Sequence, residues 1–87
     1  HTVLSAGNGE VEIYEIGIPA ALQGKVIGEL LQDNTECLAV SLTRAGKAIV
    51  PNAKTGVAAG DLVLMSATYD GITALRQALA RFEEKLP

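Results

Sequence analysis

Three basic residues, Arg44, Lys47 and Lys54, fall within a stretch of the chain that contains no acidic residue. This stretch runs from Cys37 to Gly60 and carries three positive charges, in a chain whose formal net charge is −3. An arginine can hold a phosphate through two parallel N–H donors, and a local excess of positive charge attracts anions. The pattern leaves two alternatives open: a site for a small anionic ligand, or an ordinary solvated loop.

Nucleophilic catalysis has few residues to work with. The chain has one histidine, His1, and one cysteine, Cys37. A serine or cysteine nucleophile needs a base held beside it, and a terminal histidine is poorly suited to that role. We therefore expect no enzyme, and we interpret Cys37 as a small core residue. A single cysteine also excludes a disulfide framework and a cysteine-based zinc site.

Two other sites are weakly indicated. Glu10 and Glu12 share one face at strand spacing and Glu15 is close in sequence, but a hard cation needs more oxygen ligands, so we expect a solvated face and no metal. Lys47, in a predicted hairpin, is typical of a lipoyl or biotinyl attachment lysine. An enzyme accessory domain is thus an alternative, although carrier domains of that type are all-β.

Length and composition limit the remaining classes. A chain of 87 residues with 48% hydrophobic and 20% charged residues predicts one domain, and three aromatic residues imply an aliphatic core. No apolar run is long enough to span a bilayer, and no signal peptide is evident. We expect a cytoplasmic location without direct membrane insertion. The acidic balance argues against nucleic-acid binding.

Alternating residues predict four strands, at 11–18, 37–43, 48–50 and 62–67. The apolar phase changes between Ile13 and Ile16, which predicts either a kink near Tyr14-Glu15 or a strand buried on both faces. In the second strand, alternation places Leu38, Val40 and Leu42 on one face. Residues 44–47 predict a hairpin turn, and the apolar run 62–65 predicts an interior strand.

Helical spacing predicts two helices. The first covers Leu22 to Leu31 and ends at Asp33-Asn34, with Asn34 as a left-handed cap. The second starts at Asp70 as N-cap and either lies on the sheet or forms a helix–helix seam. Its apolar stripe consists of Ile72, Leu75, Leu79, Phe82 and Leu86.

The predicted order is strand, helix, three strands, helix. This order favours a two-layer α+β domain in which both helices pack against a small mixed or antiparallel sheet. We expect residues 1–9, with a turn at Gly7-Asn8-Gly9, to be an N-terminal arm or a remnant of processing. Residues 10–87 are expected to form the single domain.

Several short motifs, in order, resemble the TrkA C-terminal domain, also called the RCK C-terminal domain. The resemblance covers about Glu10 to Phe82. Its motifs are an apolar strand ending in Ile18-Pro19, then Leu22-x-Gly24-Lys25, Glu29-Leu30, Ala48-Ile49-Val50-Pro51-Asn52, and Thr55-x-Val57-x-x-Gly60-Asp61 before the strand at Leu62.

The resemblance implies a regulatory, ligand-sensing domain of a potassium uptake system or channel. Such domains form homodimers and act beside a Rossmann-type nucleotide-binding domain and a membrane transporter or channel subunit, at the inner face of the plasma membrane. Some bind cyclic di-AMP at the dimer interface. The matching positions for a regulatory ligand, cyclic di-AMP or another anionic nucleotide, are Arg44, Ala45, Ile49, Val50 and Pro51. We expect no cofactor, and expect the segment from Leu22 to Leu31 to help form the dimer surface.

Two positions depart from the family pattern. Ala48 stands where binders of cyclic di-AMP often carry asparagine, and Ala59 stands where proline usually precedes the glycine-aspartate turn. The first departure favours the alternative, a structural dimerisation module of an antiporter or anion permease without a small-molecule ligand. Because the 87 residues hold no Rossmann partner, we expect an excised domain or an abbreviated regulator.

Overall fold

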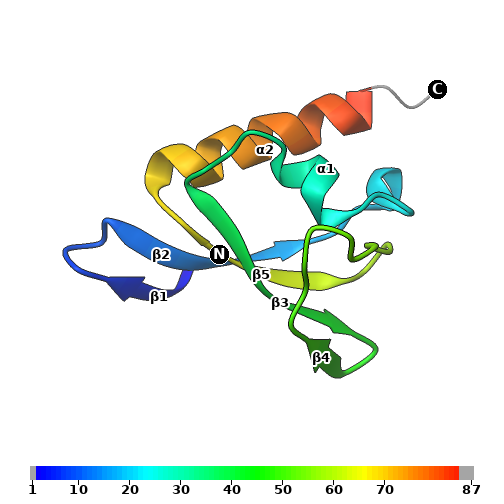
Figure 1. Cartoon of the computed structure of the whole chain (residues 1–87), viewed down its shortest axis with the longest axis horizontal. Helices are drawn as coiled ribbons and strands as arrows, with labels where there is room; N and C mark the ends of the chain where they lie inside the picture. The colour runs from blue at the N-terminus through cyan, green and yellow to red at the C-terminus, as the bar shows by residue number, and fades with distance from the viewer. Residues whose placement is uncertain (1, 85–87) are drawn as a thin grey trace.

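One antiparallel sheet organises the chain, with strands in the order β1-β2-β5-β3-β4 (Figure 1). The computed structural model describes residues 2–84, and the side chains of residues 4–83. Its central strand, β5, is the predicted interior strand. The strands are β1 (Thr2–Ala6), β2 (Val11–Gly17), β3 (Cys37–Arg44), β4 (Lys47–Ile49) and β5 (Leu62–Ala67).

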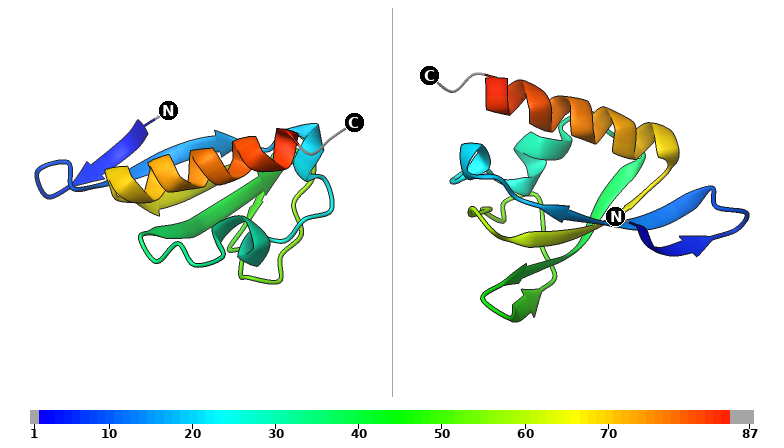
Figure 2. Two further views of the ribbon diagram at one scale, coloured as in Figure 1. Left: turned by 90° about the horizontal axis from the view of Figure 1, so that it is seen from above. Right: turned by 180° about the vertical axis from the view of Figure 1, so that it is seen from behind.

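Both helices cover the same face of this sheet (Figure 2). They are α1 (Ile27–Leu31) and α2 (Tyr69–Glu84), and a short 3-10 helix, η1 (Ala20–Leu22), precedes α1. The two-layer α+β architecture is therefore confirmed, and so is the predicted order of elements from Val11 onward. The β3–β4 hairpin extends from the sheet on the side away from the helices (Figure 1).

A strand that the sequence analysis does not predict precedes the domain's first predicted strand. β1, within the segment expected to be an arm, pairs antiparallel with β2 from Leu4 to Ala6 and at Thr2, with an irregularity between them. The predicted turn is present, since Gly7 and Gly9 have φ angles of 65° and 85°. A five-residue edge strand offers too few residues for a periodic signal.

The first helix is much shorter than predicted. Gly24 adopts a φ of 88°, which ends the helical path after η1, and α1 begins only at Ile27. Backbone bonds replace the missing helical turn, because the Gly24 N–H donates to Val57 O over 3.0 Å and Val57 N–H donates to Lys25 O over 2.8 Å. Long-range pairing with the segment before β5 therefore overrides the local helical pattern.

The end of α1 also differs from the prediction. The left-handed residue is Gln32, with a φ of 39°, and not Asn34. Asn34 instead joins β3 to α2: its Oδ1 accepts from Glu36 N–H over 3.2 Å, and its Nδ2 donates to Gly71 O over 2.9 Å. The asparagine thus serves tertiary packing.

The irregularity predicted for β2 lies in β3. β2 pairs with β5 in continuous register from Glu12 to Gly17, so the kink prediction is wrong. Tyr14 and Ile16 are buried against the helices, and Ile13 is half-buried on the opposite face. This matches the other reading of the phase change, a strand covered in part on both sides.

A bulge in β3 changes which of its residues face the core. The register with β5 shifts between Ala39 and Ser41, which leaves Val40 as an extra residue. Leu38 is consequently 67% exposed, whereas Leu42 is 2% exposed. The prediction that Leu38, Val40 and Leu42 share one face is therefore wrong.

Helix α2 lies on the sheet, which decides between the two alternatives for its apolar stripe. Ile72 and Leu75 are buried, while Leu79 and Phe82 pack against the core; Leu86 lies outside the described residues. The N-cap is Thr68 and not Asp70, because Thr68 Oγ1 accepts from Gly71 N–H over 3.0 Å. The aliphatic core is confirmed.

We predict that Gly71→Ala destabilises the fold even though alanine favours a helix by about 1 kcal/mol. A Cβ at Gly71 would collide with the carbonyl of Glu36 at the start of β3. Overpacking of this kind costs about 1–3 kcal/mol, measurable by urea unfolding. The exposed control Gln77→Ala should change stability by less than about 0.5 kcal/mol. Wild-type stability in Gly71→Ala would contradict this packing.

Candidate ligand-binding groove

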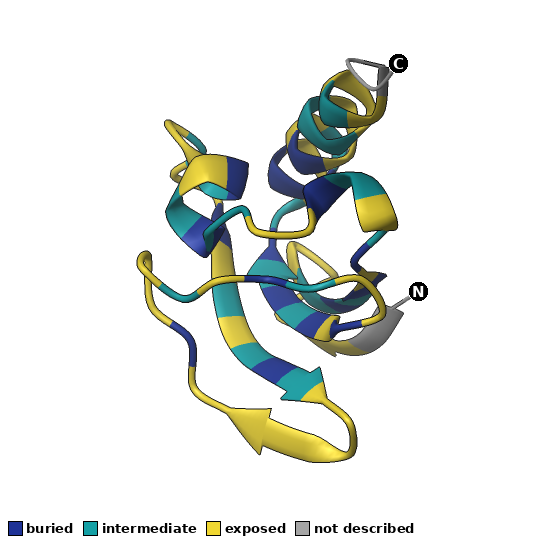
Figure 3. Ribbon diagram, turned by 90° about the vertical axis from the view of Figure 1, so that its right-hand side faces the viewer, coloured by how far each residue is buried: buried dark blue, intermediate teal, exposed yellow. Residues whose placement is uncertain are grey.

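The β3–β4 hairpin places two cationic side chains on one face of the sheet edge. Its two-residue loop has positive φ angles, 51° at Ala45 and 80° at Gly46, as a type I′ turn requires. Arg44 and Lys47 are directly paired across the two strands, so their side chains project to the same side. The tip of the hairpin and the whole of β4 are exposed (Figure 3).

A groove of about 630 Å³ runs between this hairpin and residues 55–58. Apolar side chains and two cations line it, and no acidic residue does. Its floor includes Leu42 and Val57, which are 2% and 3% exposed. The groove can therefore receive an apolar ring beside an anionic group. The lining residues are Gln23, Leu42, Arg44, Ala45, Lys47, Ile49, Thr55, Gly56, Val57 and Ala58.

Arg44 is held by a carboxylate that lies beneath the groove. Its Nε donates to Asp61 Oδ1 over 2.8 Å, and its Nη2 donates to Asp61 Oδ2 over 2.7 Å and to Gly56 O over 3.1 Å. Asp61 is 1% exposed, and its Oδ2 also accepts from Ala58 N–H over 2.8 Å. The pair fastens the hairpin to the segment that leads into β5.

This contact changes the electrostatics of both partners. The hydrogen bond from Arg44 lowers the pKa of Asp61, the Ala58 amide adds to the effect, and burial opposes it. The same hydrogen bond raises the pKa of Arg44. Arg44 and Asp61 are therefore both charged at neutral pH and offset each other. The positive charge near the hairpin is smaller than the sequence alone indicates.

Three of the five predicted ligand positions come together in the groove. Arg44, Ala45 and Ile49 line it. Pro51 lines a separate hollow of about 300 Å³ next to α1, and Val50 is 86% exposed and lines neither. For an anionic ligand, Lys47 was named from the sequence only as part of the basic stretch, and neither Gln23 nor Asp61 was predicted to lie at the ligand site. The Gly60-Asp61 turn in the sequence was the signal that could have identified Asp61.

Four aliphatic side chains on β3, on β4 and directly after β4 are exposed. Leu42 pairs with Ile49, so antiparallel register places Val50 next to the β3 bulge. We call Leu38, Val40, Ile49 and Val50 the β3–β4 apolar patch; their exposed fractions run from 39% to 86%. This patch, and not α1, offers apolar surface to a partner.

The expected dimer surface from Leu22 to Leu31 is not available as predicted. Leu22, Ile27 and Leu30 are at most 3% exposed because they fill the core beneath α2. Only Val26 and Leu31 among the apolar residues of that helical pattern are partly exposed. The helical spacing correctly indicated a buried face, but that face is covered by the chain's own core.

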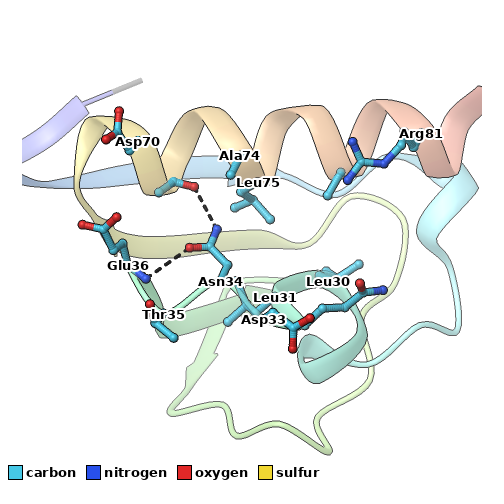
Figure 4. A pocket seen from close by; sticks show the side chains of 13 residues that line it. Leu30, Leu31, Asp33, Asn34, Thr35, Glu36, Asp70, Ala74, Leu75 and Arg81 are labelled. Carbon is cyan, nitrogen blue, oxygen red and sulfur yellow. Dashed lines mark hydrogen bonds between the residues drawn. The ribbon is translucent and has the colours of Figure 1, made fainter.

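A third hollow, of about 450 Å³, lies between α2 and the connection from α1 to β3 (Figure 4). Asn34 lies across it, joined to Glu36 and to the first turn of α2. Asp33, Asp70 and Arg81 also line the hollow. Within residues 2–84, no group of three or more side chains is placed to hold a metal ion.

Cys37 is a core residue, as expected. It is 8% exposed, and burial raises the pKa of its thiol to about 11. The thiol is thus protonated at neutral pH, and a protonated thiol is a poor nucleophile. Among the described residues, no helix is long and apolar enough to span a membrane.

We predict that Asp61→Asn removes an acid-sensitive part of the stability. Because the folded pKa of Asp61 lies below its ordinary value of 3.8, the stabilisation is complete above that value and is lost as the pH falls through the folded pKa. Urea unfolding should show Asp61→Asn less stable by about 1–3 kcal/mol at pH 7. The gap between variant and wild type should narrow below about pH 4. A gap independent of pH would contradict the ion pair.

Comparison with known proteins gives structural matches only: no protein-family model and no curated protein matches this sequence. The GsuK RCK domain superposes with a TM-score of 0.67 at 22% identity, over 83% of this chain and 17% of that one. The GsuK channel bound to NAD gives 0.70 at 22%, over 83% and 14%. The chain thus spans less than a fifth of either GsuK chain.

A third solved structure has nearly the size of this domain. The RCK C-terminal domain dimer of S. agalactiae BusR, in complex with cyclic di-AMP, gives a TM-score of 0.64 at 25% identity, over 78% of this chain and 95% of that one. The sheet order and the helix layer described above are thus those of this class of domain. The resemblance seen in the motifs is confirmed by the structure, and the chain has the fold of an RCK C-terminal, or TrkA C-terminal, domain.

Proposed function

We propose that this chain is a cytoplasmic regulatory domain that senses an anionic nucleotide for a potassium uptake system or channel. The observation that carries the proposal is the groove, where an apolar floor lies beside Arg44 and Lys47 on one hairpin. The BusR domain, which has this fold, is a dimer in complex with cyclic di-AMP. Cyclic di-AMP is accordingly the first ligand to test.

The ligand would contact the hairpin from both sides of the groove. Ile49 and Leu42 offer apolar contact to a base, and Lys47 faces the phosphate. Ala45, at the turn, leaves room for the ligand to approach the backbone. Val50 and Pro51 lie outside the groove, so they would contact the ligand only if a second chain extends the site beyond β4. The site would therefore be complete only in a dimer.

Ligand binding would regulate by linkage. A ligand that binds one arrangement of the dimer better than another shifts the population toward it, by typically 1–3 kcal/mol. The partners that would receive the signal are a Rossmann-type nucleotide-binding domain and a transporter or channel subunit at the inner face of the plasma membrane. The domain itself would perform no catalysis.

A second candidate function is a structural dimerisation module of an antiporter or anion permease, without any ligand. The bond between Arg44 and Asp61 favours it, because this arginine already has a partner. Ala48 in place of asparagine favours it as well. Under this alternative the β3–β4 apolar patch would still form the dimer, and the groove would stay empty.

We predict that isothermal titration with cyclic di-AMP shows saturable binding at one ligand per two chains, with ATP and cyclic di-GMP as comparison ligands. Lys47→Gln should weaken the binding by on the order of tenfold, because a charged donor to the phosphate is lost. The matched control is Lys54→Gln, a cation that does not line the groove. Absence of heat from wild type would reject the sensor and leave the dimerisation module.

We predict that Val50→Asp abolishes dimerisation. Val50 is 86% exposed, so the substitution leaves the monomer folded but places a charge in the β3–β4 apolar patch. Sedimentation equilibrium should show a wild-type dimer and a monomeric variant at the same concentration. Leu4→Asp is the matched control, since Leu4 is 65% exposed on β1. A dimeric Val50→Asp protein would exclude this patch as the interface.

A further inference from the structure

The groove offers one uncompensated positive charge per chain. Arg44 and Lys47 are the charged residues that line it, and Asp61, directly behind Arg44, offsets one of them. We propose that Asp61 is a specificity-determining residue that adjusts the groove to a single phosphodiester and disfavours pyrophosphates and terminal phosphates. This inference rests on the proposed function, since it names the ligand class of the same groove.

The geometry of the Arg44 donors supports this assignment. A guanidinium has five N–H donors, one on Nε and two on each Nη atom. Asp61 takes the Nε donor and one Nη2 donor, and Gly56 O takes the second Nη2 donor. The two donors left are both on Nη1, which donates to none of the described residues. Arg44 can therefore touch one phosphate oxygen but cannot form the two-atom fork that a dianionic phosphate favours.

A ligand could use two adjacent N–H donors of Arg44 only by displacing Asp61, and that displacement would be unfavourable. Its side chain is 1% exposed, so without Arg44 a buried carboxylate would keep only the Ala58 amide as a partner. Asp61 thus keeps the Nε–Nη2 edge of the Arg44 guanidinium occupied, and only the two N–H donors on Nη1 remain for a ligand.

Charge balance then selects the ligand class. A phosphodiester carries one negative charge, which the one net positive charge of each groove can balance. A cyclic dinucleotide has two phosphodiesters, one for each chain of a dimer. A pyrophosphate concentrates two or more negative charges at one groove, and one of them would stay uncompensated in a partly apolar site, which is unfavourable.

The test is the affinity ratio between cyclic di-AMP and ADP, measured by isothermal titration at fixed ionic strength. In Asp61→Asn the groove gains a net positive charge while the side chain keeps its shape. We expect ADP to bind on the order of tenfold more tightly than to wild type, and cyclic di-AMP to change much less. Gln23→Lys, at an exposed lining position, adds a charge and leaves Asp61 in place, although it removes the hydrogen bond that Gln23 Oε1 accepts from Ala59 N–H over 2.6 Å. It should act in the same direction.

Asp33→Asn is the matched control, because it changes the net charge equally at an exposed residue outside the groove. An unchanged ratio in folded Asp61→Asn protein would overturn the assignment. If Asp61→Asn does not fold, an unchanged ratio in Gln23→Lys would overturn it, because the charge of the groove would then not select the ligand. If wild type binds no cyclic di-AMP, the proposed sensor fails. Tighter ADP binding by Asp61→Asn, with the control unchanged, would still show that Asp61 sets the charge of the groove.

Discussion

The ion pair between Arg44 and Asp61 fastens two segments that lie side by side at the edge of the sheet, because their neighbours Thr43 and Leu62 are register partners. One is the end of β3, at the base of an exposed hairpin, and the other is the turn that leads into β5. Asp61 is buried, so its charge is tolerated only because Arg44 and the Ala58 amide satisfy it. Through Gly56 O as well, Arg44 links the two walls of the groove, the hairpin and residues 55–58.

The same segment links the groove to the helix layer. After β4 the chain returns along α1, where Gly28 N–H donates to Ala53 O over 2.9 Å and Ile27 N–H donates to Thr55 O over 2.9 Å. Gly56, which accepts from Arg44, also forms a bridge with Val26. Under the proposed function, a ligand that moves residues 55–58 would therefore pull on the start of α1.

Local sequence patterns correctly predicted β5, the two-residue hairpin and the apolar stripe of α2. In these elements the local pattern and the tertiary packing agree. The failures have tertiary causes. Gly24 ends a helical pattern because its backbone pairs with Val57, and the bulge at Val40 reverses a clean alternation. The charges of Arg44, Lys47 and Lys54 indicated a site for an anion as one of two alternatives, yet only the fold pairs Arg44 with Asp61, far along the chain.

The groove and its proposed selectivity depend most on the coupling between Arg44 and Asp61, which a double-mutant cycle measures directly. Urea unfolding of Arg44→Gln, Asp61→Asn and the double variant gives the interaction free energy of the pair. The structure predicts strongly non-additive losses, with the double variant close in stability to either single variant. Additive losses would mean that the two side chains act independently, and that the ion pair does not hold the groove together.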